Sequence, residues 1–382
     1  MGTPFKERLN QAAISDIATA VQSAWAEFPA AAFIQTASDG LDALELMARV
    51  AQIAQALGQH LPDDFATASD VLVRALGEAA PVDAPEAATR EGQGIRGFLA
   101  LPVTRWVADS GQENPQAALQ ALGEMTSRFS AEFDIRAFIA QHPEITWAQL
   151  KVWATDADPH RRRLASEGPR PYLPWGRKIK ALIEDPAPGL EILEMLRDDP
   201  ELYVRRSVAN HLNDIARHQP GLVVQVARRW LEEPLEGEAL ARRRQMVRHA
   251  LRGLLKKADP GALDLMGYHR ESPAQIEGLS ADDTASLGSA LTWSFEAHNP
   301  SDAPVQVRLD YVLHRPLAKG KIGTRICHIA ERQLEAGQRV LYDRTHSFKA
   351  VTTRSDYPGA HRIEVRINGV VRSEVGFEVV TA

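Results

Sequence analysis

The sequence predicts a mainly α-helical protein, in which a HEAT-like repeat solenoid is followed by a small all-β immunoglobulin-like sandwich. Three observations support this prediction: helical spacing of apolar residues through the first 270 residues, a repeat of helix pairs, and strict alternation afterwards. At 382 residues the chain is also longer than one hydrophobic core normally serves. We therefore expect a helical domain at 1–270, a linker at 271–284 and a sandwich at 285–382.

The N-terminal half has apolar residues three or four positions apart, which is typical of amphipathic helices. A helix is predicted over 41–57, with Asp39 or Ser38 as its N-cap. The Pro-, Ala- and Glu-rich segment 77–94 interrupts this spacing and is expected to form a surface loop. Further helices are expected at 119–122, 135–139 and 147–153.

The later helices repeat. The pattern Val-Arg-x-x-Val-x-x-x-Leu at Val204 returns as Val-Arg-x-x-Leu-x-x-x-Leu at Val247, 43 residues further on. A period of about 40–47 residues is typical of HEAT-type helix pairs, which stack into a curved solenoid. Asp-Pro pairs at 158–159 and 199–200 each begin a further unit, with arginines following. Because these arginines occupy equivalent positions in successive repeats, they should lie on one face of the solenoid.

From about residue 271 the apolar spacing changes to two, which predicts β-strands. Val305 to Leu313 alternates with polar residues, and Ile363 to Ile367 alternates before Asn368-Gly369, a hairpin-turn signal. About 110 residues of this kind suggest an immunoglobulin-like sandwich. The remaining strands are expected at 292–297, 325–330, 338–342 and 374–380.

Charge is distributed unevenly along the chain, whose formal net charge is -6. Residues 1–150 hold nine Lys/Arg and 19 Asp/Glu, whereas residues 151–257 hold 21 Lys/Arg and 15 Asp/Glu. A basic middle in an acidic chain favours a local surface for a polyanion such as nucleic acid. Chance asymmetry on a solvated helical surface would give the same distribution.

Several classes of protein are excluded by missing features. A single cysteine, Cys327, allows no internal disulfide framework and no Cys-based metal site. The sequence has neither a phosphate loop nor a dinucleotide fingerprint, and we expect no metal and no cofactor. No apolar run approaches the roughly 18 residues that span a bilayer, and the N-terminus has no signal core. We expect a cytoplasmic protein that does not bind membranes.

The segment 160–175 is the most informative part of the chain. An arginine-rich helix start leads to Glu167, Gly168 and three prolines then end the helix, and Trp175 follows directly. A purely structural helical repeat has little reason to interrupt itself in this way.

This segment resembles the AlkC branch of the AlkC/AlkD-type alkylpurine DNA glycosylases, which are HEAT-like repeat enzymes. A C-terminal Ig-like domain also occurs in part of that family. Pro169 and Tyr172 depart from the family pattern, in which a small hydroxyl and a basic residue are more common. The matching motifs are Pro4-Phe5-Lys6, Gly40–Leu46, Phe129–Arg136, Arg162–Trp175 and Val204–Asp214.

The resemblance implies a monofunctional DNA glycosylase that releases cationic alkylated bases, 3-methyladenine first, from double-stranded DNA. It implies that Glu132, Glu167 and Asp214 are the active-site carboxylates. Trp175 would face the lesion, and Arg163 would hold the DNA backbone or the carboxylates. No lysine stands out as a nucleophile, so we expect no strand cleavage, and we expect a monomer.

The chemistry agrees with these roles. Both the alkylated base and the oxocarbenium-like sugar are positively charged, so carboxylates near C1′ stabilise both and can position a water. An indole face attracts a cation by about 0.5–2 kcal/mol. Neutral bases gain none of this stabilisation, which gives selectivity without a tight base pocket.

Basic residues expected to contact DNA occur in both predicted domains. Those in the helical part are Arg161, Arg162, Arg170, Lys178, Arg205, Arg206, Arg244 and Arg248, with Lys180 and Arg252 as further candidates. Those in the sandwich are Arg315, Lys319 and Lys321, in a loop without acidic residues.

Structural roles remain open for single residues. Glu132 as a surface acid, Asp214 paired with Arg217, and Trp175 as a core aromatic are the alternatives. Arg205 or Arg206 could instead form repeat-to-repeat ion pairs with Asp198 or Asp199. For the whole chain, the alternative is a non-catalytic HEAT scaffold that binds DNA or protein.

Overall fold

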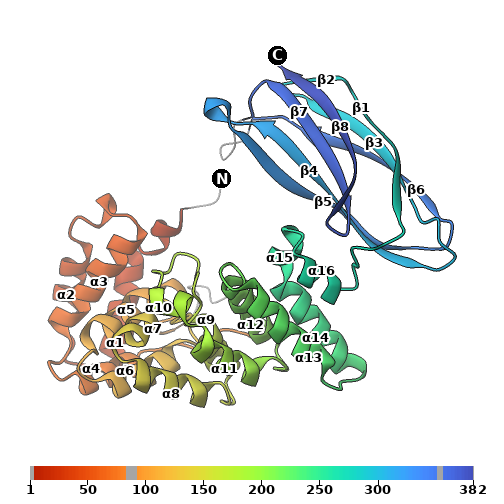
Figure 1. Ribbon diagram of the computed structural model, residues 1–382. Helices are drawn as coiled ribbons and strands as arrows, with labels where there is room; N and C mark the ends of the chain where they lie inside the picture. Colours follow the sequence, from red (N-terminus) through yellow and green to blue (C-terminus); the bar gives the residue numbers. More distant parts are fainter. Residues whose placement is uncertain (1–3, 83–92, 351–355, 382) are drawn as a thin grey trace. The chain divides into compact units, whose positions relative to one another are not determined.

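The computed structural model describes residues 4–82, 93–350 and 356–381 (Figure 1). The chain divides into two compact units. The first comprises Met1–His218 and Leu235–Ala250, and the second comprises Gln219–Pro234 and Leu251–Ala382. None of the helices in these described ranges is long and apolar enough to cross a membrane.

The first unit is built from α-helices and short 3₁₀ turns. Helix α9 packs against α12, and α12 packs against α14, so helices from successive predicted repeats are neighbours. The curvature of a solenoid stays a prediction. The elements are η1 (Phe5–Arg8), α1 (Gln11–Ala24), α2 (Ala30–Ser38), η2 (Leu41–Ala43), α3 (Leu46–His60), α4 (Phe65–Arg74), η4 (Gly97–Leu99), α5 (Ala100–Ser110), α6 (Pro115–Met125), α7 (Ile135–Gln141), α8 (Pro143–Trp153), α9 (Pro159–Glu167), α10 (Lys180–Glu184), α11 (Ala187–Leu196), α12 (Leu202–Ile215) and α14 (Gly237–Ala250).

Short polar residues set the starts of several helices. The Asp158 carboxylate accepts a hydrogen bond from the backbone N–H of His160 at 2.8 Å, and Pro159 is the first residue of α9. An aspartate cap followed by proline satisfies one free N–H and removes another, so the Asp-Pro pair begins the helix as the sequence predicts.

Helix α3 begins later than the sequence predicts. Gly40 has a left-handed φ of 65°, Leu41–Ala43 forms a 3₁₀ turn, and Leu44 is extended. The predicted cap is therefore wrong: Asp39 lies at the C-terminal end of α2, and α3 starts only at Leu46. Leu41 in the turn is buried like the apolar residues of α3, so the apolar spacing continues through the turn. The break between the turn and the helix is therefore not visible in the sequence pattern.

The 43-residue repeat is visible in the contacts of two arginines. Arg162 donates to backbone carbonyls five and six residues before it, at 3.0 and 2.9 Å. Arg205, 43 positions later, donates to the carbonyls five and six residues before it, at 2.8 and 2.6 Å. Each arginine thus folds back on the turn that begins its own helix, as expected for equivalent positions of two repeats.

The predicted loop 77–94 lies partly outside the described residues, since 83–92 are not described. Its ends meet in a parallel β-bridge between Leu76 and Ile95. The carbonyl of Ala80, near the start of this loop, lies 2.9 Å from a ring nitrogen of His160 in α9.

In its described residues, the second unit combines three α-helices with a two-layered β-sandwich. One sheet has the strand order β1-β3-β6 and the other β2-β8-β7-β4-β5. Strand β2 is parallel to β8, and the other pairs are antiparallel. The elements are α13 (Pro220–Glu232), α15 (Arg252–Lys256), α16 (Pro260–Leu265), β1 (Gln275–Ala281), β2 (Thr284–Ser286), β3 (Ala290–His298), β4 (Val305–Pro316), η5 (Ala318–Gly320), β5 (Ile322–Leu334), β6 (Arg339–Ser347), β7 (Gly359–Ile367) and β8 (Val370–Val380).

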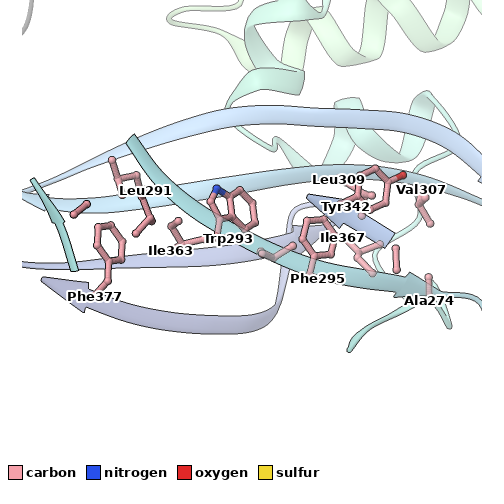
Figure 2. Close-up of a cluster of buried hydrophobic side chains, with 14 of the residues drawn as sticks. Ala274, Leu291, Trp293, Phe295, Val307, Leu309, Tyr342, Ile363, Ile367 and Phe377 are labelled. Atoms are coloured by element: carbon pink, nitrogen blue, oxygen red, sulfur yellow. The ribbon is translucent and has the colours of Figure 1, made fainter. Parts of the chain in front are cut away.

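Alternate side chains of the two sheets form the core of the sandwich (Figure 2). Trp293 and Phe295 of the smaller sheet meet Leu309, Ile363 and Phe377 of the larger one, and all five are buried. The spacing of two places these residues on one face of each strand, which is why the sequence predicts the sandwich correctly.

The hairpin predicted at Asn368-Gly369 is confirmed. The two residues have φ values of 51° and 78°, and they join β7 to β8. Two successive positive φ values match the twist of an antiparallel pair, and Asn and Gly tolerate them best.

The linker predicted at 271–284 is wrong in part, because β1 lies within it. Ile276 and Leu279 of β1 pack against the sandwich core. The register of β1 shifts between Glu277 and Ser280, where Gly278 has a φ of 61°. This bulge interrupts the alternation on which the sequence prediction depends.

Candidate active site

A pocket of about 370 Å³ opens in the first unit, between α9, α12 and the loops beside them. Glu132 and Arg163 bring opposite charges into its lining. Most of the remaining wall is aromatic or apolar, and its aromatic residues are Phe129, Phe133, His160, Trp175 and Tyr203. Such a pocket can hold a flat or cationic group against a fixed carboxylate.

Arg136 fixes the loop that follows α9. Its Nη1 donates to the carbonyls of Gly168 and Arg170 at 2.6 and 2.8 Å, and its Nε and Nη2 donate to the Arg177 carbonyl. Burial lowers the pKa of Arg136 to about 10, so the group remains charged at neutral pH. A Cβ on Gly168 would lie 2.6 Å from Ile135, so this loop leaves α9 at a point where only glycine fits.

Trp175 lies near the end of this loop and lines the pocket. Its φ is 63°, which is uncommon for a residue other than glycine, and 77% of its surface is exposed. The alternative of a core aromatic is therefore wrong. An exposed indole beside a pocket is available to a ligand.

The three predicted carboxylates are joined by two arginines in one continuous chain of ion pairs. Arg163 contacts Glu132 at 2.8 Å and Glu167 at 3.6 Å. Arg170 contacts Glu167 at 2.5 Å and Asp214 at 2.9 Å. The structure thus brings together four residues that the sequence assigned to the site, from the loop before α7, from α9 and from α12.

Glu132 and Arg163 line the pocket, whereas the other two carboxylates lie deeper. The Glu132 side chain is 14% exposed, against 6% for Glu167 and 1% for Asp214. Ser130 Oγ donates to Glu132 Oε2 at 2.7 Å and accepts from Arg163 at 2.8 Å. Glu132 is therefore not an ordinary helix-surface acid: its carboxylate is held in place at the pocket wall.

Burial and charge act in opposite directions in this chain of ion pairs. Burial alone would raise the pKa of Glu167, but the guanidinium groups of Arg163 and Arg170 outweigh it and hold that pKa below its ordinary value. Ser207 adds a hydrogen bond to Glu167 at 2.7 Å. For Asp214 burial prevails over the attraction of Arg170, and its pKa is raised. Glu167 is consequently held in its ionised form more firmly than Asp214.

Asp214 has two cationic neighbours. Arg170 donates to its Oδ2, and Arg217 lies 3.6 Å from its Oδ1. The structural alternative of an Asp214–Arg217 pair is therefore present, but as the longer of two contacts.

Five of the arginines predicted to contact DNA are engaged in contacts within the protein. Arg170 and Arg205 are buried, so the prediction of direct DNA contact is corrected for both. Arg162 pairs with Asp199 at 2.6 Å, and Arg315 pairs with Asp356 at 2.7 Å. The five are Arg161, Arg162, Arg170, Arg205 and Arg315.

Repeat-to-repeat ion pairs do occur, but through other arginines than those suggested. Arg162 of α9 pairs with Asp199, and Arg243 of α14 pairs with Asp198. Arg205 donates instead to backbone carbonyls, as described above. The identity of the arginine depends on the packing of neighbouring helices, which sequence spacing alone does not fix.

Most of the remaining predicted DNA contacts are exposed, whereas Arg252 is half-buried. Arg206 also lines a smaller pocket of about 230 Å³ between α12 and α14. The Lys319 side chain lies outside the described part of the structure. The exposed residues are Lys178, Lys180, Arg206, Arg244, Arg248 and Lys321.

Several residues that build the site were not assigned a role from the sequence. Arg136 gave no local signal, because the carbonyls that it binds lie 32 to 41 positions away. The ring of Tyr203 lies 5.0 Å from the Arg163 guanidinium. Ser130 and Ser207 could have been found by searching the matched motifs for hydroxyl groups near the predicted carboxylates. In the described ranges, no cluster of three or more His, Cys, Asp or Glu residues is arranged to hold a metal ion.

His211 in α12 contacts the backbone of α9 next to Glu167, and its burial makes the stability of the folded protein depend on pH. It is buried, its Nδ1 lies 2.9 Å from the Ser166 carbonyl, and burial lowers its pKa to about 4. The unfolded chain takes up this proton near pH 6.5, but the folded protein does so only near pH 4. The free energy of unfolding should therefore fall by about 3 kcal/mol between those pH values.

Urea unfolding of the wild type and of His211→Gln at several pH values between 4 and 7 measures this effect. The variant should lose less stability on acidification, so the stability of the wild type relative to the variant should decrease as the pH falls. Parallel pH profiles for the two proteins would contradict the prediction.

Comparisons with known proteins extend over the whole chain. Residues 275–381 match the family model described as "Uncharacterised protein YhaZ, C-terminal Ig-like domain". The protein YhaZ of Bacillus subtilis (strain 168) is 34% identical over 377 residues, which cover 98% of this chain and 99% of YhaZ. The solved structure "Pseudomonas fluorescens alkylpurine DNA glycosylase AlkC bound to DNA containing an abasic site analog" is 30% identical, with a TM-score of 0.84. That match covers 99% of this chain and 100% of the other, so it includes both the helices and the β-sandwich.

Proposed function

The chain belongs to the family of the alkylpurine DNA glycosylase AlkC and of YhaZ, and from this premise we propose that it is a DNA-repair glycosylase. The observation that carries the proposal is the chain of ion pairs that ends at Glu132, in an aromatic pocket. In this proposal the enzyme hydrolyses the bond between an alkylated base and its sugar, and it does not cut the DNA strand.

The proposed substrates are cationic alkylated bases, with 3-methyladenine first and 3-methylcytosine as a further candidate. A cationic base is a good leaving group and needs little acid catalysis. The sugar becomes positively charged as the bond breaks, so a fixed negative charge stabilises the transition state more than the ground state. The exposed face of Trp175 adds a cation–π attraction of about 0.5–2 kcal/mol.

Glu132 is proposed to be the catalytic residue nearest to the reacting sugar. Ser130 and Arg163 fix its Oε2, so the carboxylate needs no reorganisation when positive charge develops. The same carboxylate can position the attacking water. Glu167 and Asp214 contribute negative charge from deeper in the site, and they orient Arg163 and Arg170.

The exposed basic residues are proposed to contact DNA phosphates. Lys178 lies on the loop that carries Trp175, and Arg206, Arg244 and Arg248 lie on α12 and α14. Each phosphate contact steepens the dependence of log K on log salt by about 0.9. Lys321 of the sandwich is a further candidate.

A base-release assay tests the proposal. The protein is incubated with methylated duplex DNA, and released 3-methyladenine and 3-methylcytosine are measured together with DNA affinity. The wild type should release base, and Glu167→Gln and Asp214→Asn should release it more slowly. Glu184→Gln is the matched control, because it changes an exposed carboxylate on α10 that pairs with Lys180.

Two results would overturn the proposal. Tight DNA binding by the wild type without any base release would indicate a scaffold. Absence of salt-sensitive DNA binding would indicate a repeat protein that binds peptides instead.

A further inference from the structure

We propose that the N-terminal turn η1 belongs to the active site, with Phe5 as the positioning residue that holds Trp175 beside the pocket. The effect of Phe5 on catalysis rests on the proposed function. The contact between the rings of Phe5 and Trp175 is independent of that function and can be tested separately.

Trp175 needs support from outside its own loop. Its backbone has a left-handed φ of 63°, which a tryptophan does not prefer, and burial does not fix a ring that is 77% exposed. The ring centroid of Phe5 lies 5.8 Å from that of Trp175, and the two planes meet at 65°. This is the edge-to-face geometry favoured by aromatic pairs.

Phe5 is itself held by further rings. It stacks on Phe98 at 5.7 Å with an interplanar angle of 11°, and Phe98 packs against Phe129 at 5.4 Å. Phe129 lines the pocket, and the Arg8 guanidinium lies 4.9 Å from the Phe98 ring centroid. A row of rings therefore connects Trp175 with the pocket wall.

The turn that carries Phe5 is anchored from beneath. Arg49 of α3 is 1% exposed and donates to the carbonyls of Lys6 and Leu9 at 3.0 and 3.1 Å. Because a buried guanidinium fixes the backbone on the C-terminal side of Phe5, its ring is a firm support although it is itself 49% exposed.

Holding Trp175 in advance should favour the chemical step more than DNA binding. An indole that is already in place stabilises the positive charge without an ordering cost at the moment of reaction. Loss of the Phe5 ring should let the indole leave this position for part of the time, which lowers the rate of base release.

Single-turnover base release tests this role. Phe5→Ala should lower the rate by about twofold to tenfold, the range that one aromatic pair contributes, with DNA affinity close to that of the wild type. Phe5→Tyr keeps the ring and should restore the rate. Lys6→Ala, on the same turn, removes an exposed ion pair but no ring and should behave as the wild type.

A double-mutant cycle shows whether Phe5 acts through Trp175. In a Trp175→Ala background, Phe5→Ala should cause no further loss of rate. An equal loss with and without Trp175 would overturn the proposal, and so would a wild-type rate for Phe5→Ala.

A spectroscopic measurement needs no enzymatic activity. The protein is labelled with 5-fluorotryptophan, and Trp175→Phe identifies the ¹⁹F resonance of Trp175 among those of the seven tryptophans. In Phe5→Ala this line should narrow, because a released indole moves faster, and Lys6→Ala should leave its width unchanged. An unchanged width in Phe5→Ala overturns the positioning role, whereas failure of base release in the wild type overturns only the proposed function.

Discussion

Glu132→Gln is expected to lower the rate of base release by about 10²–10³-fold, the effect of removing one preorganised electrostatic group from an active site. Of the three site carboxylates, Glu132 is the one that lines the pocket. Glutamine has nearly the same shape and can still accept the hydrogen bonds of Ser130 and Arg163. The substitution therefore removes the negative charge and leaves the geometry in place.

The measurement is single-turnover release of 3-methyladenine at saturating enzyme, with affinity for abasic DNA measured in parallel. Affinity should stay close to that of the wild type, since phosphate contacts dominate binding. Glu124→Gln is the matched control, because Glu124 also pairs with an arginine, Arg161, but lies outside the pocket. A Glu132→Gln rate within about twofold of the wild type would show that no charge stabilisation comes from this residue.

Arg170→Met is expected to lower the free energy of unfolding by about 3–5 kcal/mol at neutral pH, as breaking a buried ion pair on one side usually does. Arg170 is buried between Glu167 and Asp214, and methionine fills part of its volume without its charge. The substitution leaves two buried carboxylates without their shared cation, so burial should raise both of their pKa values in the folded state.

The pH dependence of this loss has a definite sign. A carboxyl group with a raised pKa in the folded state destabilises the protein above its unfolded pKa, and protonation removes the penalty. The stability difference between wild type and Arg170→Met should therefore be largest at pH 7–8 and shrink towards pH 4.

Arg242→Met is the control for Arg170→Met. Arg242 pairs with Glu238 one turn away on the surface of α14, and the two side chains are 38% and 83% exposed. A surface pair of this kind contributes about 0–1 kcal/mol. Equal losses for the two variants in urea unfolding would contradict a special role for Arg170.

The sequence predicted a helical part followed by a β-sandwich because both depend on local spacing. Apolar residues at three or four positions place one face of a helix inward, and a spacing of two does the same for a strand. Asn368-Gly369 and Asp158-Pro159 likewise act through their own backbone conformations. The prediction of β1 failed because the bulge at Gly278 interrupts the alternation of apolar residues. The predicted start of α3 was wrong because the apolar spacing continues through the turn that follows Gly40.

For the candidate site, the sequence alone pointed to an acid, an arginine and a tryptophan near the end of α9. Only the tertiary structure decided which charged side chains turn inward. Arg170 and Arg206 are both basic residues of matched motifs, yet one is buried between carboxylates and the other is exposed.

The physical reason is that local periodicity fixes the direction of an apolar side chain, whereas the direction of an arginine depends on the partners that folding brings within reach. Those partners lie far away in the chain: Asp214 is 44 positions from Arg170, and the carbonyl of Arg177 is 41 positions from Arg136. The sequence by itself thus determined the elements and the types of residue at the site, and the packing of distant helices determined which of them form it.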